Sequence, residues 1–501
     1  MPEIDETFLA LPLTAIADAA LTRARDLGAE HADVRVERIR TADLALHDAR
    51  LETSHTGDEL GMSVRVIHDG VWGFAGAVTL SPDAAADLAD QAIAVAEASR
   101  PVTRQRVELA PEPSHGDQVW VSAYATDPFD IPEAERIELL ADWSRRLLAS
   151  DIVTHADADL RQVKENKFYA DLAGTTTTQQ RVRLHADLTG IWVDEQSGRF
   201  ETMRTLAPPA GYGYEWLTGG EWDWERELAE LPEFLAERAK APSIEAGRYD
   251  LVIAPSNLWL TIHESIGHAT ELDRALGYEA NYAGTSFATP DQLGTLRYGS
   301  PVMHIVGDRT TEHGLSTVGY DDEGVEAQRF DLVRDGILVG YQLDRRTAAL
   351  SGIPRSNGCA YADSPLHVPI QRMANVSLQP ADNGPSTDEL LSQVDDGIFV
   401  VGDKSWSIDM QRYNFQFTGQ RFFRIKNGRL AGQVRDVAYQ ATTTDFWGAM
   451  EAVGGPQTWV LGGAFNCGKA QPGQVAPVSH GCPTALFRQI RILNTTEEAG
   501  K

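Results

Sequence analysis

Apolar positions in the first hundred residues follow helical spacing in two segments and strand spacing in the segments between them. The pattern predicts a helix, a strand, a β-hairpin and a second helix, over residues 13–27, 32–39, 61–75 and 82–98 in that order. Gly28 is placed to end the first helix, and Asp69-Gly70 is typical of a tight hairpin turn. The sequence therefore predicts an N-terminal α/β domain over residues 1–100.

The middle of the chain repeats this mixture after a proline-containing segment. Residues 101–115 include three prolines and little periodicity, which predicts a linker. A helix, three strands and an acidic, tryptophan-rich segment that becomes helical are predicted over residues 132–148, 154–161, 166–171, 176–192 and 218–235. A second boundary is predicted at residues 239–247, so that residues 116–240 form a central α/β domain.

From residue 249 onward the pattern is mostly strands and glycine turns. Two hairpins are predicted, over residues 331–341 with an Asp-Gly turn and over residues 422–432 with an Asn-Gly turn. We expect residues 246–495 to form a β-rich domain, as a barrel or a large curved sheet. The fold class predicted for the whole chain is α+β, an N-terminal α/β region followed by a β-rich region that carries one helix with candidate metal ligands.

That helix is predicted over residues 256–276, and it interrupts the strands. Ser256 or Asn257 is placed to cap its start, and Gly277 to end it. The helix contains the segment His263-Glu-Ser-Ile-Gly-His268, in which a carboxylate follows the first of two histidines. This segment is the centre of the predicted chemistry.

The two histidines are five residues apart, whereas the common zinc-peptidase motif spaces them by four. On a regular α-helix, five residues turn the direction of a side chain by about 140°, so both rings could not reach one ion. A π-bulge adds one residue to a turn and brings positions i and i+5 to one face. The spacing therefore predicts a distorted helix, and Gly267 is placed to ease the distortion.

Zinc in a hydrolase takes three protein ligands and leaves one position for water. Glu264 is placed beside His263 to act as the general base, because it can accept a proton from that water and pass it to the leaving amine. The motif lacks a third ligand. The candidates are Glu271, Asp273, His313, Cys467, His480 and Cys482. Cys467 lies in a glycine-flanked loop that could approach a metal closely.

Charge and cysteine content narrow the class of protein. The formal net charge of −29 argues against binding to nucleic acid or anionic membranes, since both need clustered Lys and Arg. No secretory signal and no apolar run of about 18 residues are recognised, so neither export nor a membrane span is predicted. Three cysteines do not make a disulfide framework, and a reducing cytoplasm is expected.

Several motifs together resemble the TldD/PmbA family of modulator peptidases. The segment from His263 to Asp273 is similar to the family's His-Glu-x-x-x-His-x-x-Glu-x-Asp helix. Further similar segments are Gly61-Met-Ser-Val-Arg-Val, Asp321-Asp-Glu-Gly, Gln328-Arg, Asp335-Gly-Ile-Leu-Val-Gly-Tyr, Arg372-Met-Ala-Asn and Asn466-Cys-Gly-Lys. They occur in the family's order and span most of the chain. Because the His-Glu motif is present, the chain resembles the metal-bearing TldD type.

The resemblance implies His263, His268 and Cys467 as zinc ligands and Glu264 as the general base. It also implies cleavage of short or unfolded peptides, as in leader trimming, inside a closed chamber made with a PmbA-type partner or as a homodimer. The segment Ser479-His-Gly-Cys482 departs from the family pattern. It could supply a group that supports the ligands, a redox partner for Cys467, or simply a packed cysteine.

Two other hypotheses remain open at this point. One is a non-enzymatic peptide-binding or scaffold subunit with a decayed site. The other is a redox or structural metal protein that uses Cys467, Cys482 and His480. The glycine turn at residues 402–406 is also a candidate lining of the site, near substrate.

Overall fold

Four long strands span the N-terminal half of the chain. The computed structural model describes residues 3–498, and its first sheet has the order β3-β2-β1-β5-β6-β4, with β7 paired to β6. The strands are β1 (His31–His47), β2 (Arg50–His68), β3 (Val71–Ala77), β4 (Asp117–Val121), β5 (His155–Asp171), β6 (Thr176–Asp194) and β7 (Arg199–Arg204). The sheet joins strands from residues 1–100 with strands from residues 116–240. The division of the chain into three domains stays a prediction.

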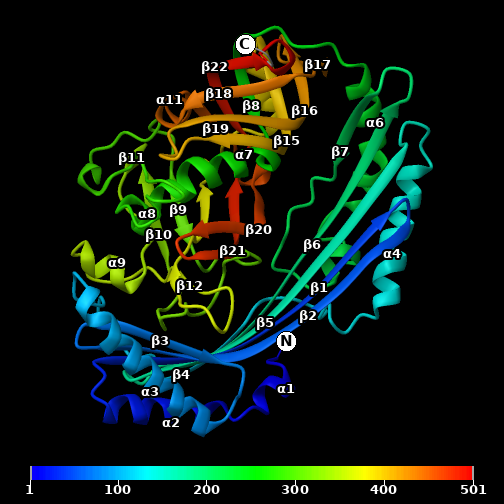
Figure 1. The fold of residues 1–501 in the computed structure, drawn as a ribbon. Helices are drawn as coiled ribbons and strands as arrows, with labels where there is room; N and C mark the ends of the chain where they lie inside the picture. The colour runs from blue at the N-terminus through cyan, green and yellow to red at the C-terminus, as the bar shows by residue number, and fades with distance from the viewer. Residues whose placement is uncertain (1–2, 499–501) are drawn as a thin grey trace.

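Helices cover the two ends of this sheet and leave its middle to the C-terminal region (Figure 1). One end packs against α2 (Leu13–Asp26) and α3 (Pro82–Ser99), and the other against α4 (Glu133–Leu148) and α6 (Trp224–Lys240). These four helices confirm the predicted ones. The short helices of this half are α1 (Glu6–Leu9), α5 (Glu215–Thr218) and the 3-10 turn Arg100–Val102.

Strand β5 is one continuous strand, so the prediction of two strands over residues 154–161 and 166–171 is wrong. Three of the four residues between them, Gln162, Lys164 and Glu165, are polar, so hydrophobic alternation did not indicate a strand there. They are nevertheless buried, because ion pairs replace the contacts with water. Lys164 Nζ lies 2.5 Å from an Asp127 carboxylate oxygen, and Arg181 donates to both oxygens of Glu165 at 3.0 and 2.9 Å.

The C-terminal region contains a five-stranded barrel, which confirms the prediction of a β-rich region. Strand order β15-β8-β22-β18-β16 is closed by the pairing of β16 with β15. The strands are β8 (Gly247–Ile253), β15 (Asp396–Ile408), β16 (Asn414–Lys426), β18 (Val437–Thr442) and β22 (Ala485–Asn494), with β17 (Arg429–Gln433) and β19 (Met450–Val453) attached. Aromatic residues, among them Phe415, Phe446 and Phe487, are buried in its core.

Smaller sheets pack beside the barrel. They comprise β9 (Ile305–Asp308), β10 (Arg329–Arg334), β11 (Ile337–Leu338) and β14 (Asn375–Leu378); β12 (Ala360–Tyr361) and β13 (Ile370–Gln371); and the hairpin β20 (Val460–Ala470) with β21 (Gly473–Cys482). Both predicted hairpins are confirmed, with positive φ at Asp335-Gly336 and Asn427-Gly428 as type I′ turns require.

The remaining helical segments follow the barrel strands or connect the small sheets. They are α7 (Pro255–Ile262), a π-turn (His263–Gly267), a 3-10 turn (His268–Thr270), α8 (Leu272–Ala275), α9 (Arg345–Leu350), α10 (Thr387–Ser392), α11 (Thr443–Gly448), α12 (Thr495–Glu498) and the 3-10 turns Pro290–Gln292 and Pro456–Thr458. None of the described helices combines the length and the apolar character that crossing a membrane requires.

Candidate metal centre

The helix that carries the His-Glu motif leaves the barrel directly after β8. Pro255 occupies its first turn, where its missing N–H costs nothing, and Ala254 precedes it without a side-chain cap. The prediction that Ser256 or Asn257 caps this helix is wrong, because both side chains bind strand β15 instead. Ser256 Oγ accepts from the N–H of Gly402 at 3.0 Å, and the Asn257 amide donates to the carbonyl of Gly402 at 2.9 Å. These bonds fix α7 to the barrel.

The predicted π-bulge is present as the turn His263–Gly267. The helix is not continuous to Leu276, however, because Glu271 adopts an extended conformation with ψ of 116° and separates the last short helix. Gly277, with φ of +87°, ends that helix as predicted. Gly267 has an ordinary helical φ of −52°, so its backbone conformation does not require glycine. Glycine fits there because a Cβ would lie 2.6 Å from Met373 Sδ.

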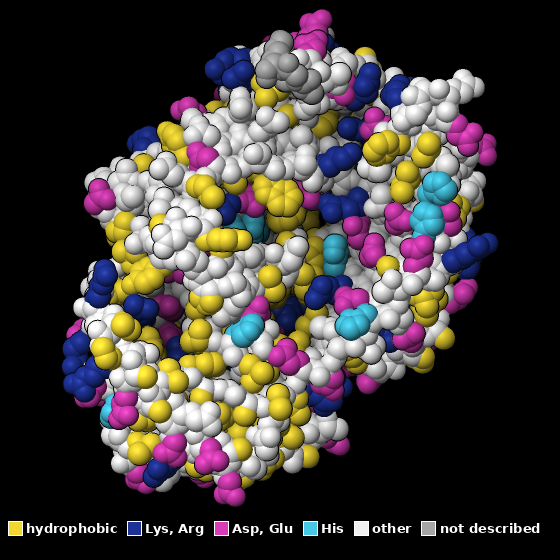
Figure 2. Space-filling view, in the orientation of Figure 1, with side chains coloured by type: hydrophobic (Ala, Val, Ile, Leu, Met, Phe, Trp, Pro, Cys, Tyr) yellow, Lys and Arg dark blue, Asp and Glu magenta, His cyan; other side chains and the backbone are white. Residues whose placement is uncertain are grey.

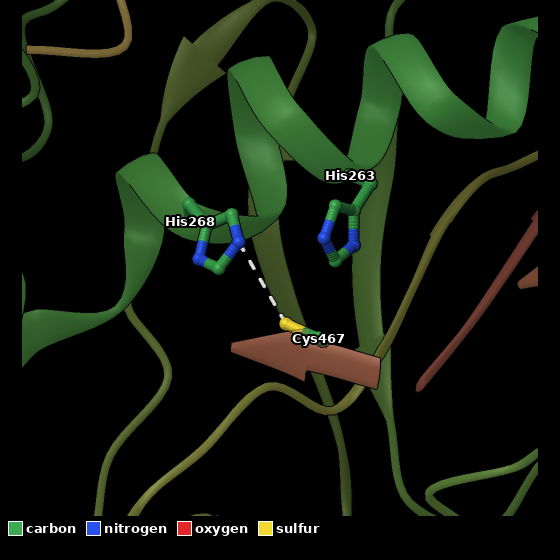
Figure 3. A group of neighbouring side chains, drawn as sticks. All are labelled: His263, His268 and Cys467. Atoms are coloured by element: carbon green, nitrogen blue, oxygen red, sulfur yellow. Dashed lines mark hydrogen bonds between the residues drawn. The ribbon is translucent and has the colours of Figure 1, made fainter. Parts of the chain in front are cut away.

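The bulged turn brings His263 and His268 to the same side, facing Cys467 of β20 (Figure 3). One ligand atom from each residue lies within 4.8 Å of the other two, and Cys467 Sγ is 3.7 Å from His268 Nε2. A register shift in β20 between Ala464 and Cys467 sets the position of the thiol. The three side chains are buried, at 5%, 5% and 3% exposure. The structure thus gathers the three residues that the sequence proposes as ligands.

Hydrogen bonds fix which nitrogen of each ring has a free lone pair. His480 Nδ1 lies 2.8 Å from the carbonyl oxygen of Val376, so it must donate there, and its Nε2 is then an acceptor. His480 Nε2 lies 2.8 Å from His263 Nδ1, which therefore carries a proton and leaves His263 Nε2 free. On the second ring, His268 Nδ1 donates to Glu271 Oε2 at 2.8 Å.

The two partners, His480 and Glu271, therefore act as the supports that metal-binding histidines usually have. Burial lowers the pKa of His263 and His268 well below the usual range and that of His480 to about 4, so all three rings are neutral. Burial raises the pKa of the Cys467 thiol to about 12, against the effect of the Arg372 guanidinium 3.3 Å away. A thiolate at this place needs a further positive charge. Two neutral imidazole nitrogens and one sulfur are a donor set that fits Zn²⁺.

Glu264 lies on the same turn, with its carboxylate held by Arg412 of the β15–β16 loop and by Trp406. Burial raises its pKa above the usual range, while Arg412 acts in the opposite direction. Sequence reasoning did not find Arg412, since nothing in its neighbourhood marks it. Thr443 holds its backbone, because Thr443 Oγ1 donates to the Arg412 carbonyl oxygen at 2.7 Å.

The other candidate third ligands lie elsewhere. Asp273 binds Lys469 at 2.6 Å, and the His313 ring stacks on Tyr212 with 3.5 Å between centroids. Cys482 Sγ lies 3.7 Å from the carbonyl oxygen of Pro255. On the β20–β21 ladder Cys467 pairs with Ala476, six residues and about 20 Å from Cys482. This separation contradicts the hypothesis of a redox pair.

A cavity of about 1100 Å³ opens onto the candidate metal centre. Figure 2 shows a hollow between the C-terminal region and the long sheet on this face. His263, Glu264, His268 and Cys467 line the cavity, together with parts of β15, β16, β20 and α6. The predicted turn at residues 402–406 does line it, through Asp403, Lys404 and Trp406.

A buried His, His, Cys donor set beside a carboxylate, in the lining of a large cleft, fits a metal-dependent hydrolase. Two family profiles match the chain. Residues 246–494 match the PmbA/TldA metallopeptidase C-terminal domain, and residues 32–96 match PmbA/TldA metallopeptidase domain 1. The chain belongs to the PmbA/TldD metallopeptidase family.

Relatives over nearly the full length carry names that agree with this family. The chain is 28% identical to a metalloprotease of Methanothermobacter thermautotrophicus, over 98% of this chain and 100% of that one. It is 24% identical to a protein of Saccharolobus solfataricus named zinc metalloprotease TldD homolog, over 94% and 98% of the two chains. The names of these relatives support a metal-dependent peptidase.

Solved structures of low sequence identity share the fold. A Thermotoga maritima protein described as a modulator of DNA gyrase superposes with a TM-score of 0.76 at 15% identity, over 96% of this chain and 100% of that one. TldE from Thermococcus kodakarensis superposes with a TM-score of 0.73 at 15% identity, over 95% and 99%. The long sheet and the barrel are therefore the architecture of known members.

Proposed function

We propose that this protein is a zinc-dependent peptidase that cleaves short or unfolded peptides, as in peptide maturation. His263, His268 and Cys467 would hold the metal, and Glu264 would be the general base. One observation supports this assignment above the others. Both imidazole rings are neutral and have their Nδ1 protons bound by Glu271 and His480, so each directs a free Nε2 lone pair toward one place beside the Cys467 sulfur.

The roles follow from the positions of the side chains. Zn²⁺, when bound, lowers the pKa of water and polarises a carbonyl group. Glu264, next to His263 on the bulged turn, accepts the proton of the attacking water and donates it to the leaving amine. Its raised pKa suits both steps, because a carboxyl that titrates closer to neutral pH both gains and loses a proton readily. Arg412 and Trp406 hold its carboxylate in place.

The size of the cavity supports a peptide substrate rather than a small metabolite. At about 1100 Å³ it exceeds the range of about 300–1,000 Å³ that is typical of small-molecule pockets. A segment of extended chain fits such a space, whereas a folded domain does not. The cavity therefore supports short peptides and unfolded segments as the proposed substrates.

We also propose that the protein works in the cytoplasm, with a PmbA-type partner subunit or as a homodimer. All three cysteines are free and buried, as a reducing compartment allows. The likeness in fold to TldE supports a partner of that type.

The test combines metal analysis with one substitution. Protein purified without chelator should contain about one zinc per chain. The variant Glu264→Gln should keep this zinc and lose cleavage of an unfolded polypeptide such as reduced casein. Loss of zinc together with loss of cleavage would assign Glu264 to the ligand set instead. Unchanged cleavage would refute its role as the base, and a wild-type chain that neither contains nor takes up zinc would favour the scaffold hypothesis.

A further inference from the structure

One arginine in the wall of the metal cleft has no acidic partner. Arg421 lies on β16, is 4% exposed and lines the cavity. In the part of the chain that the structure describes, its side chain forms no ion pair and no hydrogen bond, and Nε is buried without a partner. Its guanidinium carbon instead lies 4.4 Å from the centre of the Phe234 ring. Stacking on a ring leaves the edge of a guanidinium free for another group.

Two other arginines of the same cleft are paired. Arg204 donates to an Asp403 carboxylate oxygen at 2.8 Å, and Arg412 binds Glu264. The acid nearest in charge to Arg421 is Glu227, but its two oxygens already accept from the N–H of Leu206 at 3.1 Å. The Trp222 indole N–H also donates to Glu227 at 3.2 Å, so the carboxylate is oriented by Leu206 and Trp222, and it forms no hydrogen bond with Arg421.

An unpaired buried cation is costly for a fold. Burial lowers the pKa of Arg421, and the charges of Glu227 and Glu230 act against this shift without cancelling it. Lys404, a second cation of the wall, is exposed and has only a 3.4 Å contact with Thr202 Oγ1. A chain with a net charge of −29 thus has, among its described residues, a buried arginine without an ion pair in this cleft.

The surroundings of Arg421 are apolar on one side. Phe234, Phe399 and Phe423 line the cavity beside it, with 5.7 Å between the ring centres of Phe234 and Phe423 and 6.2 Å between those of Phe399 and Phe423. This aromatic group, Phe234, Phe399 and Phe423, suits an apolar side chain. The arginine at its border suits a planar carboxylate, which a guanidinium binds through two parallel hydrogen bonds.

We propose that Arg421 and this aromatic group form a specificity subsite for a carboxylate-bearing residue of the peptide. The inference rests on the proposed peptidase function and names the substrate class of the same cleft. The carboxylate is either the C-terminal α-carboxylate or the side chain of Asp or Glu. Arg421 is the residue that selects it.

The experiment measures binding without cleavage. Metal-free protein is titrated into four fluorescently labelled alanine-rich hexapeptides, each with one leucine, and anisotropy is recorded. The peptides combine a free or amidated C-terminus with a glutamate or a glutamine near it. Wild-type protein should bind at least one acidic peptide about 10- to 100-fold more tightly than the amidated glutamine peptide, the range of a charge-assisted hydrogen-bonded pair. The peptide that shows the gain identifies which carboxylate is recognised.

Arg421→Met should remove this preference and leave binding of the amidated glutamine peptide unchanged, while Arg421→Lys should lose only part of it. Arg424→Met is the matched control, because Arg424 lies on the same strand and also stacks on a ring, that of Tyr249 at 4.4 Å, but does not line the cleft. Equal binding of all four peptides to the wild type, or an equal loss for all four in Arg421→Met, would overturn the proposal. Since binding is measured without metal, a protein that binds acidic peptides but never cleaves them would contradict only the peptidase function.

Discussion

The substitution His480→Ala tests the assignment of His263 as a ligand most directly. In the structure His480 Nε2 accepts the Nδ1 proton of His263 at 2.8 Å, and His480 is itself fixed by its 2.8 Å bond to the carbonyl oxygen of Val376. Alanine removes the acceptor. The His263 ring is then free to turn and to place its proton on Nε2, the atom that should face the metal, and its Nδ1–H loses its partner in a buried site.

The expected effect is on metal affinity. Removing the group that orients a metal-binding histidine costs about 10- to 100-fold in affinity, or about 1.4–2.8 kcal/mol. The zinc dissociation constant of His480→Ala should therefore rise by this factor, measured by competition with a chromophoric chelator on metal-free protein. His480→Gln should lose less, since its amide can still accept from His263 and donate to Val376.

Two controls separate this effect from unfolding. The first is thermal unfolding of the metal-free variants, which shows whether the fold persists. The second is His304→Ala, because His304 is a half-exposed histidine that does not line the cleft. A zinc affinity of folded His480→Ala equal to that of the wild type would refute the argument. It would mean that His480 does not determine which nitrogen of His263 meets the metal.

Three further outcomes follow from the structure. Gly267→Ala should lower the free energy of unfolding by about 1–3 kcal/mol in denaturant titrations, because the new Cβ would lie 2.6 Å from Met373 Sδ, whereas Gly448→Ala, with open space at its Cβ, should change it little. Burial raises the pKa of Glu37 from 4.5 to about 7, so the folded state keeps this proton between these values while the unfolded state releases it. The contribution of Glu37 to stability therefore falls by about 3 kcal/mol as the pH rises from 4.5 to 7. Glu37→Gln has no such proton and should flatten the pH profile of the unfolding temperature over this range. A profile parallel to that of the wild type would contradict the raised pKa of Glu37. Cys482→Ser should leave zinc content and the one-thiolate charge-transfer band of the cobalt-substituted protein unchanged; loss of that band would mean that Cys482 is a ligand.

The local elements could be predicted from the sequence because local rules determine them. Helical and strand spacing located α2, α3 and α4, and the turn residues located both C-terminal hairpins. The spacing of His263 and His268 even predicted the π-turn, since only a bulged helix lets both rings reach one ion.

The contacts that complete the site could not be predicted in the same way. His480 reaches His263 across 217 residues of sequence, and Arg412 reaches Glu264 across 148. No periodicity relates such positions, because they meet only when the β20–β21 hairpin and the β15–β16 loop have packed against α7. The continuous β5 was missed for a related reason, since its polar residues are buried through ion pairs made with partners elsewhere in the fold.

The β20–β21 hairpin is a two-stranded sheet of its own, with no strand pairing to the barrel. It carries Cys467 on one strand and His480, which supports His263, on the other. A metal held by His268 and Cys467 would close a loop of 199 residues and tie this hairpin to the barrel. Zinc would then stabilise the packing of the hairpin in addition to its catalytic role. Its removal should increase amide hydrogen exchange in the hairpin before exchange in the barrel strands changes.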